Sequence, residues 1–435
     1  MRDQSHHILL SREEAVSQML AALDEKFAAN TWDNVPIAEA CGRVVAHDVH
    51  ARADAPTCLT CRMDSVAVHY DDFAAAAPEL PDVSVWERGR DWEFANTGTA
   101  MPDGFDAAVV VEHVTFSEDG ECVLAIDAAP SARFAGTRPR GSQMSRGELL
   151  ASAGTRVTPE LAAHIAAGNV AYVPVRRRPR VAFIPTGGEL QTPGSPFVCE
   201  DKNVETNSVL VRAKVEAWGG EFVGFQTVRD RPAAIKLALR QACEVADIVV
   251  LNAGSSKGSA DWTSEVLDEV ASRVICHQTN HGPGRHSSYA IVDETPVMGI
   301  SGPSGGVSPT LDFYLRPIMR RALGLEPEVS PVLARLAAPF SHGGGPFGAA
   351  GSGRPGDAPA GELPPRERPP EGFRAIRFVS VAQGSDGVLV ATPVEGGPDS
   401  LAATLANAYY LMPVGPGKRP PAPGDLIPVE LRGAF

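Results

Sequence analysis

The sequence predicts a multidomain α/β protein, and three observations lead to this fold class. Residues 180–323 alternate strand-like apolar runs with helical segments, which is the pattern of a parallel sheet covered by helices on both faces. Residues 55–133 instead contain short β-type runs separated by Gly- and Asp-rich turns, as in a small β domain. The length of 435 residues is enough for about three domains of ~150 residues each.

Composition and charge narrow the class of protein further. The hydrophobic content of 43% is ordinary for a globular chain, and we find no apolar run of the ~18 residues that a membrane span needs. The first residues, MRDQSHHILLSREEA, have no apolar stretch long enough for a signal peptide. The net charge of −14 argues against non-specific nucleic-acid binding. We therefore expect a cytoplasmic protein whose partners include neither membrane nor nucleic acid.

The seven cysteines are odd in number and scattered, so we expect no disulfide framework. One close pair, Cys58 and Cys61, forms a CxxC motif of the kind found in redox and metal sites. Because no second pair lies nearby to complete a zinc site, packing or chance is the simpler interpretation.

Caps and periodicity predict the elements that precede residue 179. Ser11 and Glu14 form a capping box at the start of a helix that reaches about residue 27. Thr158-Pro159 opens another helix, and Gly168 lies just beyond its end. Strands are expected at residues 66–70, 107–114, 122–126 and 170–175.

In the α/β region the predicted strands and helices alternate. The strands are residues 180–184, 221–227, 247–252, 274–277 and 297–300, and the helices are residues 207–218, 232–244, 262–270 and 309–323. Ligands of such sheets bind at the carboxyl ends of the strands. The segment Thr186-Gly187-Gly188-Glu189 and the loop after residue 252 both follow strands, so they should share that edge.

The loop after residue 252 has the composition of an anion-binding turn. Residues 248–261 read IVVLNAGSSKGSAD, an apolar strand that passes into small residues before a helix. Glycines allow backbone N–H groups to turn toward an anion, and hydroxyls and the helix start add further donors. Asp261 would repel a bare phosphate, so it suggests a divalent cation or a substrate hydroxyl. The simpler alternative is an ordinary βα turn with Asp261 as N-cap.

The C-terminal part predicts a compact β module interrupted by an insert. Residues 341–372 are rich in Gly and Pro and lack a hydrophobic pattern, so we expect a disordered linker or loop. Strand-like runs follow at residues 378–381 and 388–392, and the chain ends near PGDLIPVEL.

Five motifs along the chain resemble a known family. They are SREEAVSQML with IAEACGRVVAHDV, Cys61-Arg62-Met63-Asp64-Ser65-Val66-Ala67-Val68, Asn96-Thr97-Gly98-Thr99-Ala100-Met101-Pro102-Asp103-Gly104 followed by Asp106-Ala107-Ala108-Val109-Val110, residues 180–190, and residues 248–261. In this order they resemble the molybdopterin molybdotransferases, the molybdenum insertases related to the gephyrin E domain. The resemblance covers most of the chain.

The resemblance implies four structural parts. These are an elongated, discontinuous N-terminal domain (residues 1–55 and 134–178), an inserted β domain (56–133), a molybdopterin-binding α/β domain with a parallel sheet (179–326), and a C-terminal β domain (327–435) that contains the insert 341–372. It also implies a homodimer, with the site formed between the α/β domain of one subunit and the inserted domain of the other.

The reaction implied by the resemblance is the insertion of molybdate into adenylylated molybdopterin, with Mg²⁺ and with release of AMP. Asp64, Thr97, Glu189 and Asp261 would be catalytic, and the three carboxylates would hold the metal. The substrate diphosphate would bind through residues of small loops and one arginine, namely Gly187, Gly254, Ser255, Ser256, Gly258, Ser259 and Arg285. An upstream adenylyltransferase or a recipient molybdoenzyme are the expected protein partners.

Each of these residues also has a simpler interpretation. Asp64 could cap a turn, Glu189 could be solvated after a Gly-Gly turn, and Thr97 could satisfy its own loop. Positive charge near the site could come from Lys257, His281, Arg285 and His286, or these could form a solvated surface patch.

The chain departs from the family pattern in the expected site. The acids after Gly141 are replaced by Ser142 and Gln143, and a lysine near Gly282 is replaced by Arg285, which keeps the charge. The other changes are Ser65-Val66 for Gly-Tyr, Gly188 for Asp, and Ser301 and Ser304 for two prolines. These departures leave two alternatives to the enzyme: a non-catalytic molybdopterin-binding or cofactor-delivery protein, and a scaffold that engages a partner.

Overall fold

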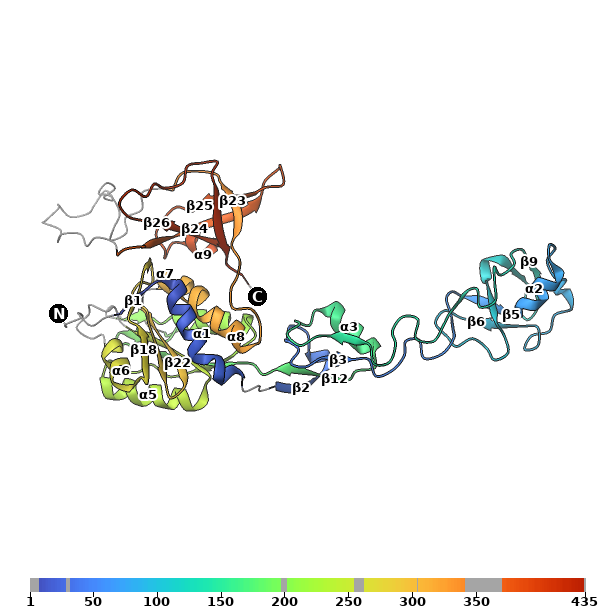
Figure 1. Cartoon of the computed structure of the whole chain (residues 1–435), viewed down its shortest axis with the longest axis horizontal. Coiled ribbons are helices and arrows are strands. Elements are labelled where there is room, and N and C mark those ends of the chain that lie inside the picture. The colour runs from blue at the N-terminus through green and yellow to red at the C-terminus, as the bar shows by residue number, and fades with distance from the viewer. Residues whose placement is uncertain are drawn as a thin grey trace. The chain divides into compact units, whose positions relative to one another are not determined.

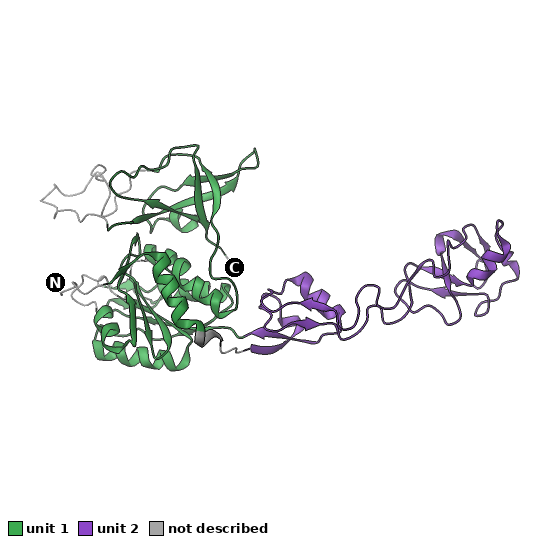
Figure 2. Ribbon diagram, viewed as in Figure 1, with its two compact units in different colours: residues 1–31, 177–435 green, residues 32–176 purple. Residues whose placement is uncertain are grey.

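A computed structural model describes residues 8–28, 32–196, 202–253, 262–302, 304–340 and 370–433. The chain divides into two compact units, and each is described by itself (Figure 2). The first unit comprises residues 1–31 and 177–435, and the second comprises residues 32–176. Within the described part of the chain, none of the helices combines the length and the apolar character needed to cross a membrane.

The first unit is built on a six-stranded sheet. Its strands lie in the order β16 (Glu221–Gly224), β13 (Arg180–Pro185), β17 (Ile248–Ala253), β22 (Thr295–Ser301), β21 (Ser288–Val292) and β18 (Arg273–Cys276). β16, β13, β17 and β22 are parallel, as predicted, but β21 is antiparallel to both of its neighbours. Asp293 and Glu294 both have positive φ, at 47° and 62°, and close a two-residue hairpin between β21 and β22. Glu is rare in such turns, so the hairpin was not predicted.

Alternate residues of the central strands face two separate cores, which confirms the expected helices on both faces. Val181 and Phe183 contribute to one core, and Ala182 and Ile184 to the other. Figure 1 shows the helices that cover the two faces. α1 (Arg12–Ala28), α4 (Asn207–Ala217), α7 (Ser304–Thr310) and α8 (Arg316–Ala322) pack on the first face, and α5 (Pro232–Val245) and α6 (Thr263–Val270) on the second.

Helix α1 begins with the capping box that the sequence predicted. The Glu14 backbone N–H donates to Ser11 Oγ at 3.1 Å, and the Ser11 backbone N–H donates to Glu14 Oε2 at 3.0 Å. The helix buries Met19 and Leu23 in the core that contains Val181. The helix therefore belongs to the same compact unit as the α/β sheet, whereas the boundaries expected from the resemblance placed it in the elongated domain. The other predicted boundaries stay predictions.

Replacing Ser11 with alanine is expected to destabilise α1 by about 1 kcal/mol, because the N–H of Glu14 loses its acceptor. Hydrogen exchange of the first-turn amides of α1 measures this loss. Ser17 is exposed on the same helix, and Ser17→Ala should leave exchange unchanged or slow it. Equal acceleration in both variants would show that the cap is unimportant.

The helix predicted at residues 309–323 starts earlier and is interrupted. It begins at Ser304 as α7, widens into a π-helical turn at Leu311–Leu315, and continues as α8. Pro317 has no N–H to donate, so the hydrogen-bond ladder cannot run regularly through this turn.

The C-terminal β module is a closed barrel, in agreement with the prediction of a compact β module. β24 (Arg374–Gln383), β25 (Leu389–Pro393), β23 (Val332–Leu336), β27 (Leu426–Leu431) and β26 (Ala408–Pro413) pair in this order, and β26 returns to β24. β20 (His281–Gly282) pairs with β24, and α9 (Leu401–Leu405) also belongs to the module. Residues 341–369 of the predicted insert lie outside the described residues.

The second unit contains two main apolar cores. The first core is formed by residues 40–51 together with residues 144–175. It contains α3 (Pro159–Ala167) and two strand pairs, β2 (Trp32–Pro36) with β12 (Tyr172–Arg176) and β3 (Val49–His50) with β11 (Leu149–Ala151). The second core contains β5 (Ser65–Val68), β6 (Trp92–Ala95), β7 (Ala107–Val110), β8 (Val114–Phe116) and β9 (Val123–Ile126). Shorter pairs complete the two units: β4 (Thr60–Cys61) with β10 (Thr137–Arg138), β1 (Leu9–Leu10) with β19 (Gln278–Thr279), and β14 (Leu190–Gln191) with β15 (Asn203–Val204).

The strand predicted at residues 66–70 ends earlier than expected. It stops at Val68, and Tyr70 begins the helix α2 (Tyr70–Ala76). The Tyr70 backbone N–H donates to Asp106 Oδ1 at 2.7 Å, which satisfies a donor at the helix start. Since Asp106 lies 36 residues away, the local pattern did not reveal this end.

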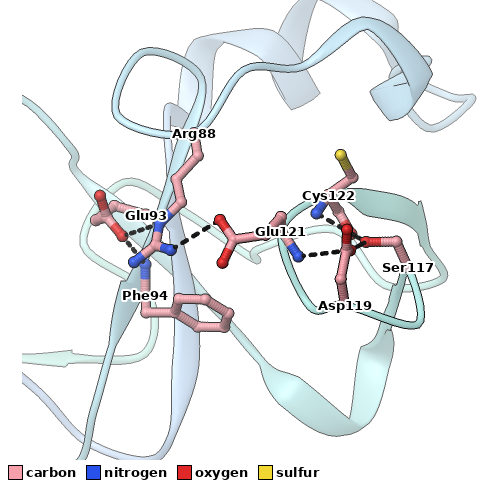
Figure 3. A network of polar contacts seen from close by, with 7 residues as sticks. All are labelled: Arg88, Glu93, Phe94, Ser117, Asp119, Glu121 and Cys122. Carbon is pink, nitrogen blue, oxygen red and sulfur yellow. Dashed lines mark hydrogen bonds and ion pairs between the residues drawn. The ribbon is translucent and has the colours of Figure 1, made fainter.

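The β8–β9 hairpin is tied to β6 by a surface network (Figure 3). Arg88 Nε donates to Glu93 Oε1 at 2.8 Å, and Arg88 Nη1 reaches Glu121 Oε2 at 3.5 Å. Ser117 Oγ closes the hairpin turn by donating to Asp119 Oδ1 at 2.6 Å. These exposed contacts position the hairpin and add little stability.

Candidate functional site

The carboxyl ends of three neighbouring parallel strands form the edge where the sequence predicted a ligand. Pro185 at the end of β13 pairs with Asn252 of β17, which in turn pairs with Ile300 of β22. The Thr186–Glu189 segment and the end of β17 therefore share one edge, as expected. Six predicted site residues lie outside the described residues, so their roles stay predictions: Gly254, Ser255, Ser256, Gly258, Ser259 and Asp261.

Gly187 shapes the loop that carries Glu189. It is buried, its φ is 141°, and a Cβ there would lie 2.8 Å from both carboxylate oxygens of Glu189. Glu189 itself is exposed. Lys202 Nζ donates to the Gly188 carbonyl, and the Gly188 N–H donates to Asp230 Oδ2 at 3.1 Å. The loop thus presents an exposed carboxylate beside a turn whose backbone conformation strongly favours glycine.

A buried polar cluster lies at the same edge, and the sequence reasoning missed it. The Thr186 hydroxyl donates to the Asn252 carbonyl at 2.7 Å, and Asn207 Nδ2 donates to Asn252 Oδ1 at 2.9 Å. Asn207 Nδ2 also donates to the Gly302 carbonyl at 2.9 Å. One signal could have revealed the cluster. The residues of β17 from Ile248 to Leu251 are all apolar, and Asn252 is a polar residue at the next position of this buried strand.

Arg285 also belongs to this edge of the sheet. It lies between β20 and β21, next to Gly284, where a Cβ would be 2.4 Å from Thr310 Oγ1 and 3.1 Å from the Gly306 carbonyl. This segment therefore packs on α7, which follows β22.

His281 does not belong to a surface patch of positive charge. It is 1% exposed, and its Nε2 lies 2.7 Å from the Tyr314 hydroxyl. Burial, together with the nearby Arg12 charge, lowers its pKa to about 3, so the imidazole is neutral. His281 packs within the core and adds no charge at neutral pH.

Asp64 and Thr97 meet in the second unit. Asp64 immediately precedes β5 and Thr97 follows β6, and these strands pair so that the two residues lie at the same end. Asp64 Oδ1 accepts from the Thr97 backbone N–H at 2.8 Å and from its hydroxyl at 3.0 Å. These hydrogen bonds hold the pKa of Asp64 below its usual range. Both bonds fall on Oδ1, so Oδ2 is the oxygen suited to a cation or a substrate hydroxyl.

A carboxylate that the sequence reasoning did not single out lies beside Gly141. Asp54 Oδ1 accepts from the Arg146 backbone N–H at 2.8 Å, and Oδ2 accepts from Arg140 Nε at 2.6 Å. These contacts, the backbone bond first, lower the pKa of Asp54. The segment around Gly141, in which Ser142 and Gln143 replace the two acids of the family pattern, therefore still packs against the ionised carboxylate of Asp54.

The carboxylates suit a magnesium ion that is completed by substrate. Within the described ranges, no group of three or more His, Cys, Asp or Glu side chains is arranged to hold a metal. Magnesium is often bound by one or two carboxylates together with substrate phosphates, and each unit by itself contains a carboxylate of that chemistry, Asp64 in the second and Glu189 in the first. Cys61 does not suggest a metal site, because its buried thiol donates to the Met63 carbonyl at 3.0 Å.

Two family models match this chain along most of its length. Residues 10–168 match the MoeA N-terminal region (domain I and II), and residues 182–321 match a probable molybdopterin binding domain. The first match contains Asp64 and Thr97. The second contains Gly187, Glu189 and Arg285.

Curated relatives and a solved structure agree with these matches. A molybdopterin molybdenumtransferase of Nostoc is 27% identical, covering 68% of this chain and 70% of that protein, and one of Haemophilus influenzae is 26% identical, covering 73% and 78%. A molybdopterin molybdenumtransferase 2 of Mycobacterium tuberculosis is 28% identical, covering 68% and 76%. The crystal structure of a molybdopterin biosynthesis MoeA protein from Pyrococcus horikoshii is 22% identical, with a TM-score of 0.71 over 98% of this chain and all of that one, so the two share a fold.

Proposed function

Because this chain belongs to the MoeA family, we propose that it is a molybdopterin molybdenumtransferase, which inserts molybdate into adenylylated molybdopterin and releases AMP. One observation carries the proposal. Both halves of the candidate site, Asp64 with Thr97 and the strand edge with Glu189, fall within the regions that match the family models.

The residues have distinct roles in this proposal. Asp64 is held ionised by Thr97 and presents Oδ2 to the reacting part of the substrate. Glu189 supplies a second carboxylate, and Arg285 supplies a positive charge for the diphosphate. Asp261 would add a third carboxylate. Asp64, Glu189 and Asp261 would hold Mg²⁺, which, when bound, supplies a positive charge that stabilises the phosphoanhydride oxygens during cleavage.

The proposal includes a homodimer that works in the cytoplasm. Asp64 and Glu189 belong to different units of the chain. In this proposal the α/β domain of one subunit and the inserted domain of the other would form the site together. The substrate would come from an adenylyltransferase and the product would pass to a molybdoenzyme.

The test is to incubate the purified protein with adenylylated molybdopterin, molybdate and Mg²⁺. We expect AMP release together with cofactor that activates an apo-molybdoenzyme. Tight binding of the substrate without AMP release would refute the enzyme and support the non-catalytic binding or delivery protein, which the altered residues Ser142, Gln143 and Gly188 favour. If no pterin binds, the scaffold alternative remains.

Asp64→Asn is expected to lower kcat/KM for AMP release at least about tenfold, because it removes a charge from the reacting centre and preserves the side-chain shape. Asp82 is a matched control in the same unit, since it accepts from the Ser84 backbone N–H at 3.0 Å and from its hydroxyl at 2.6 Å. Asp82→Asn should leave kcat/KM unchanged. Similar losses in both variants would show that the charge of Asp64 has no specific role.

A further inference from the structure

The amide of Asn207 connects two strand ends at the carboxyl edge of the sheet. Asn207 is the first residue of α4, and its Nδ2 donates both to Asn252 on β17 and to the carbonyl of Gly302, just past β22. Thr186, just past β13, bonds to the Asn252 carbonyl through its N–H and its hydroxyl. We call these residues (Thr186, Asn207, Asn252 and Gly302) the strand-end cluster.

The strand-end cluster is costly for the fold that contains it. Asn207 and Asn252 are each 4% exposed, although the strand positions before Asn252 are apolar. Among the residues that the structure describes, Asn207 Oδ1 is buried and has no hydrogen-bond partner, which lowers stability relative to an apolar side chain. Both donor bonds require Nδ2 to face Asn252 and Gly302, so the orientation of the amide is fixed by its partners. What the amide provides in return is geometric, because an apolar side chain could not make the two donor bonds to Asn252 and Gly302.

The geometry that it imposes concerns two segments of the candidate site. Thr186 starts the turn that carries Gly187 and Glu189, and Gly302 leads into α7, on which the Arg285 segment packs. Strand pairing between β17 and β22 ends at Ala253 and Ser301, so backbone pairing does not fix Gly302. The Asn207 amide supplies the missing connection.

We propose that Asn207 is a positioning residue for substrate binding: it holds the Glu189 turn and the start of α7 at the separation that the nucleotide-linked substrate requires. This inference rests on the proposed function for its kinetic consequence, but its structural part is independent. Asn207 need not contact the substrate, and it acts through Asn252, Thr186 and Gly302.

Asn207→Ala should therefore raise KM for adenylylated molybdopterin about tenfold and change kcat by less than about threefold. Hydrogen exchange should accelerate in peptides covering residues 184–190 and 300–308, and not in those covering the amino ends of β13 and β17. Asn207→Ser keeps one donor at this position, so it should have a smaller effect, and it replaces the alanine variant if that variant does not fold.

Asp247 provides a matched control at the opposite edge of the same sheet. Its carboxylate accepts from the Arg180 backbone N–H at 2.7 Å and from Arg177 at 2.7 Å, and so ties the amino ends of β13 and β17. Asp247→Ala should accelerate exchange at that edge and leave KM unchanged.

The outcomes separate this inference from the proposed function. If Asn207→Ala and Asp247→Ala raise KM equally, or if Asn207→Ala accelerates exchange uniformly, the amide stabilises the fold in general and the inference is wrong. If the wild-type protein releases no AMP, the proposed function fails. In that case the hydrogen-exchange comparison of Asn207→Ala with Asp247→Ala still decides whether Asn207 fixes the positions of the Glu189 turn and the start of α7.

Discussion

Asp312→Ala is expected to lower the free energy of unfolding of the first unit by about 3–5 kcal/mol, because it leaves a buried ammonium without its counter-ion. Asp312 is 1% exposed and lies in the π-helical turn between α7 and α8. It accepts from Lys214 Nζ at 2.6 Å and from the Tyr409 hydroxyl of the barrel at 2.7 Å. Burial lowers the pKa of Lys214, and the Asp312 charge opposes that shift. Without Asp312 the lysine must either deprotonate or draw water into the core.

Two measurements report this loss of stability: the free energy of unfolding from denaturant titration, and the hydrogen-exchange protection of the β17 amides. The double variant Lys214→Met with Asp312→Leu removes both charges and should recover most of the stability, since a buried ion pair can be replaced by apolar residues at little cost. Tyr409→Phe should cost less, about 1–2 kcal/mol, because it removes the hydrogen bonds of the hydroxyl to Asp312 and Ser308 and no charge. A loss below about 1 kcal/mol for Asp312→Ala would contradict the importance of this ion pair.

Acidification from pH 7 to pH 5 is expected to destabilise the first unit through His281 by about 2 kcal/mol. The pKa of His281 is lowered from 6.5 to about 3 in the folded protein, where burial acts first and Arg12 second. Between these two values the unfolded chain binds a proton that the folded protein does not. The stabilisation is therefore complete above about pH 6.5 and is lost progressively as the pH falls toward 3.

The slope of unfolding free energy against pH isolates the His281 contribution. His281→Gln cannot bind the proton, so its stability should fall less between pH 7 and pH 5 than that of the wild type, even if its stability at pH 7 is lower. His164 is exposed on α3, and His164→Gln should keep the wild-type slope. If His281→Gln also keeps that slope, another group causes the acid destabilisation.

Elements with local signals were predicted well. The capping box of Ser11 and Glu14 and the Thr158 cap of α3 formed as expected, because their partners lie three residues apart in sequence. The four parallel strands and the two faces of helices also followed from periodicity. The end of the strand at Val68 was missed because Asp106, far along the chain, supplies the acceptor for the start of α2.

The candidate site was predicted only in part for the same reason. The family resemblance suggested Asp64, Thr97, Gly187, Glu189 and Arg285 as site residues, and their roles stay predictions. The motifs did not reveal that Thr97 donates both of its hydrogen bonds to Asp64. Nor did they reveal the contacts of Asn207, which reach partners 45 and 95 residues away.

Local chemistry in the sequence was sufficient for α1, α3, α4, α5 and α6, for the parallel strands β13, β16, β17 and β22, and for the edge that β13 and β17 share, since caps and alternation act over a few residues. Packing of distant segments decided two other features. It buried His281 as a neutral side chain beside Tyr314, and it joined Thr186, Asn207, Asn252 and Gly302 into one cluster. Such features depend on which surfaces meet after the chain has collapsed, because burial and hydrogen-bond geometry are properties of the packed core.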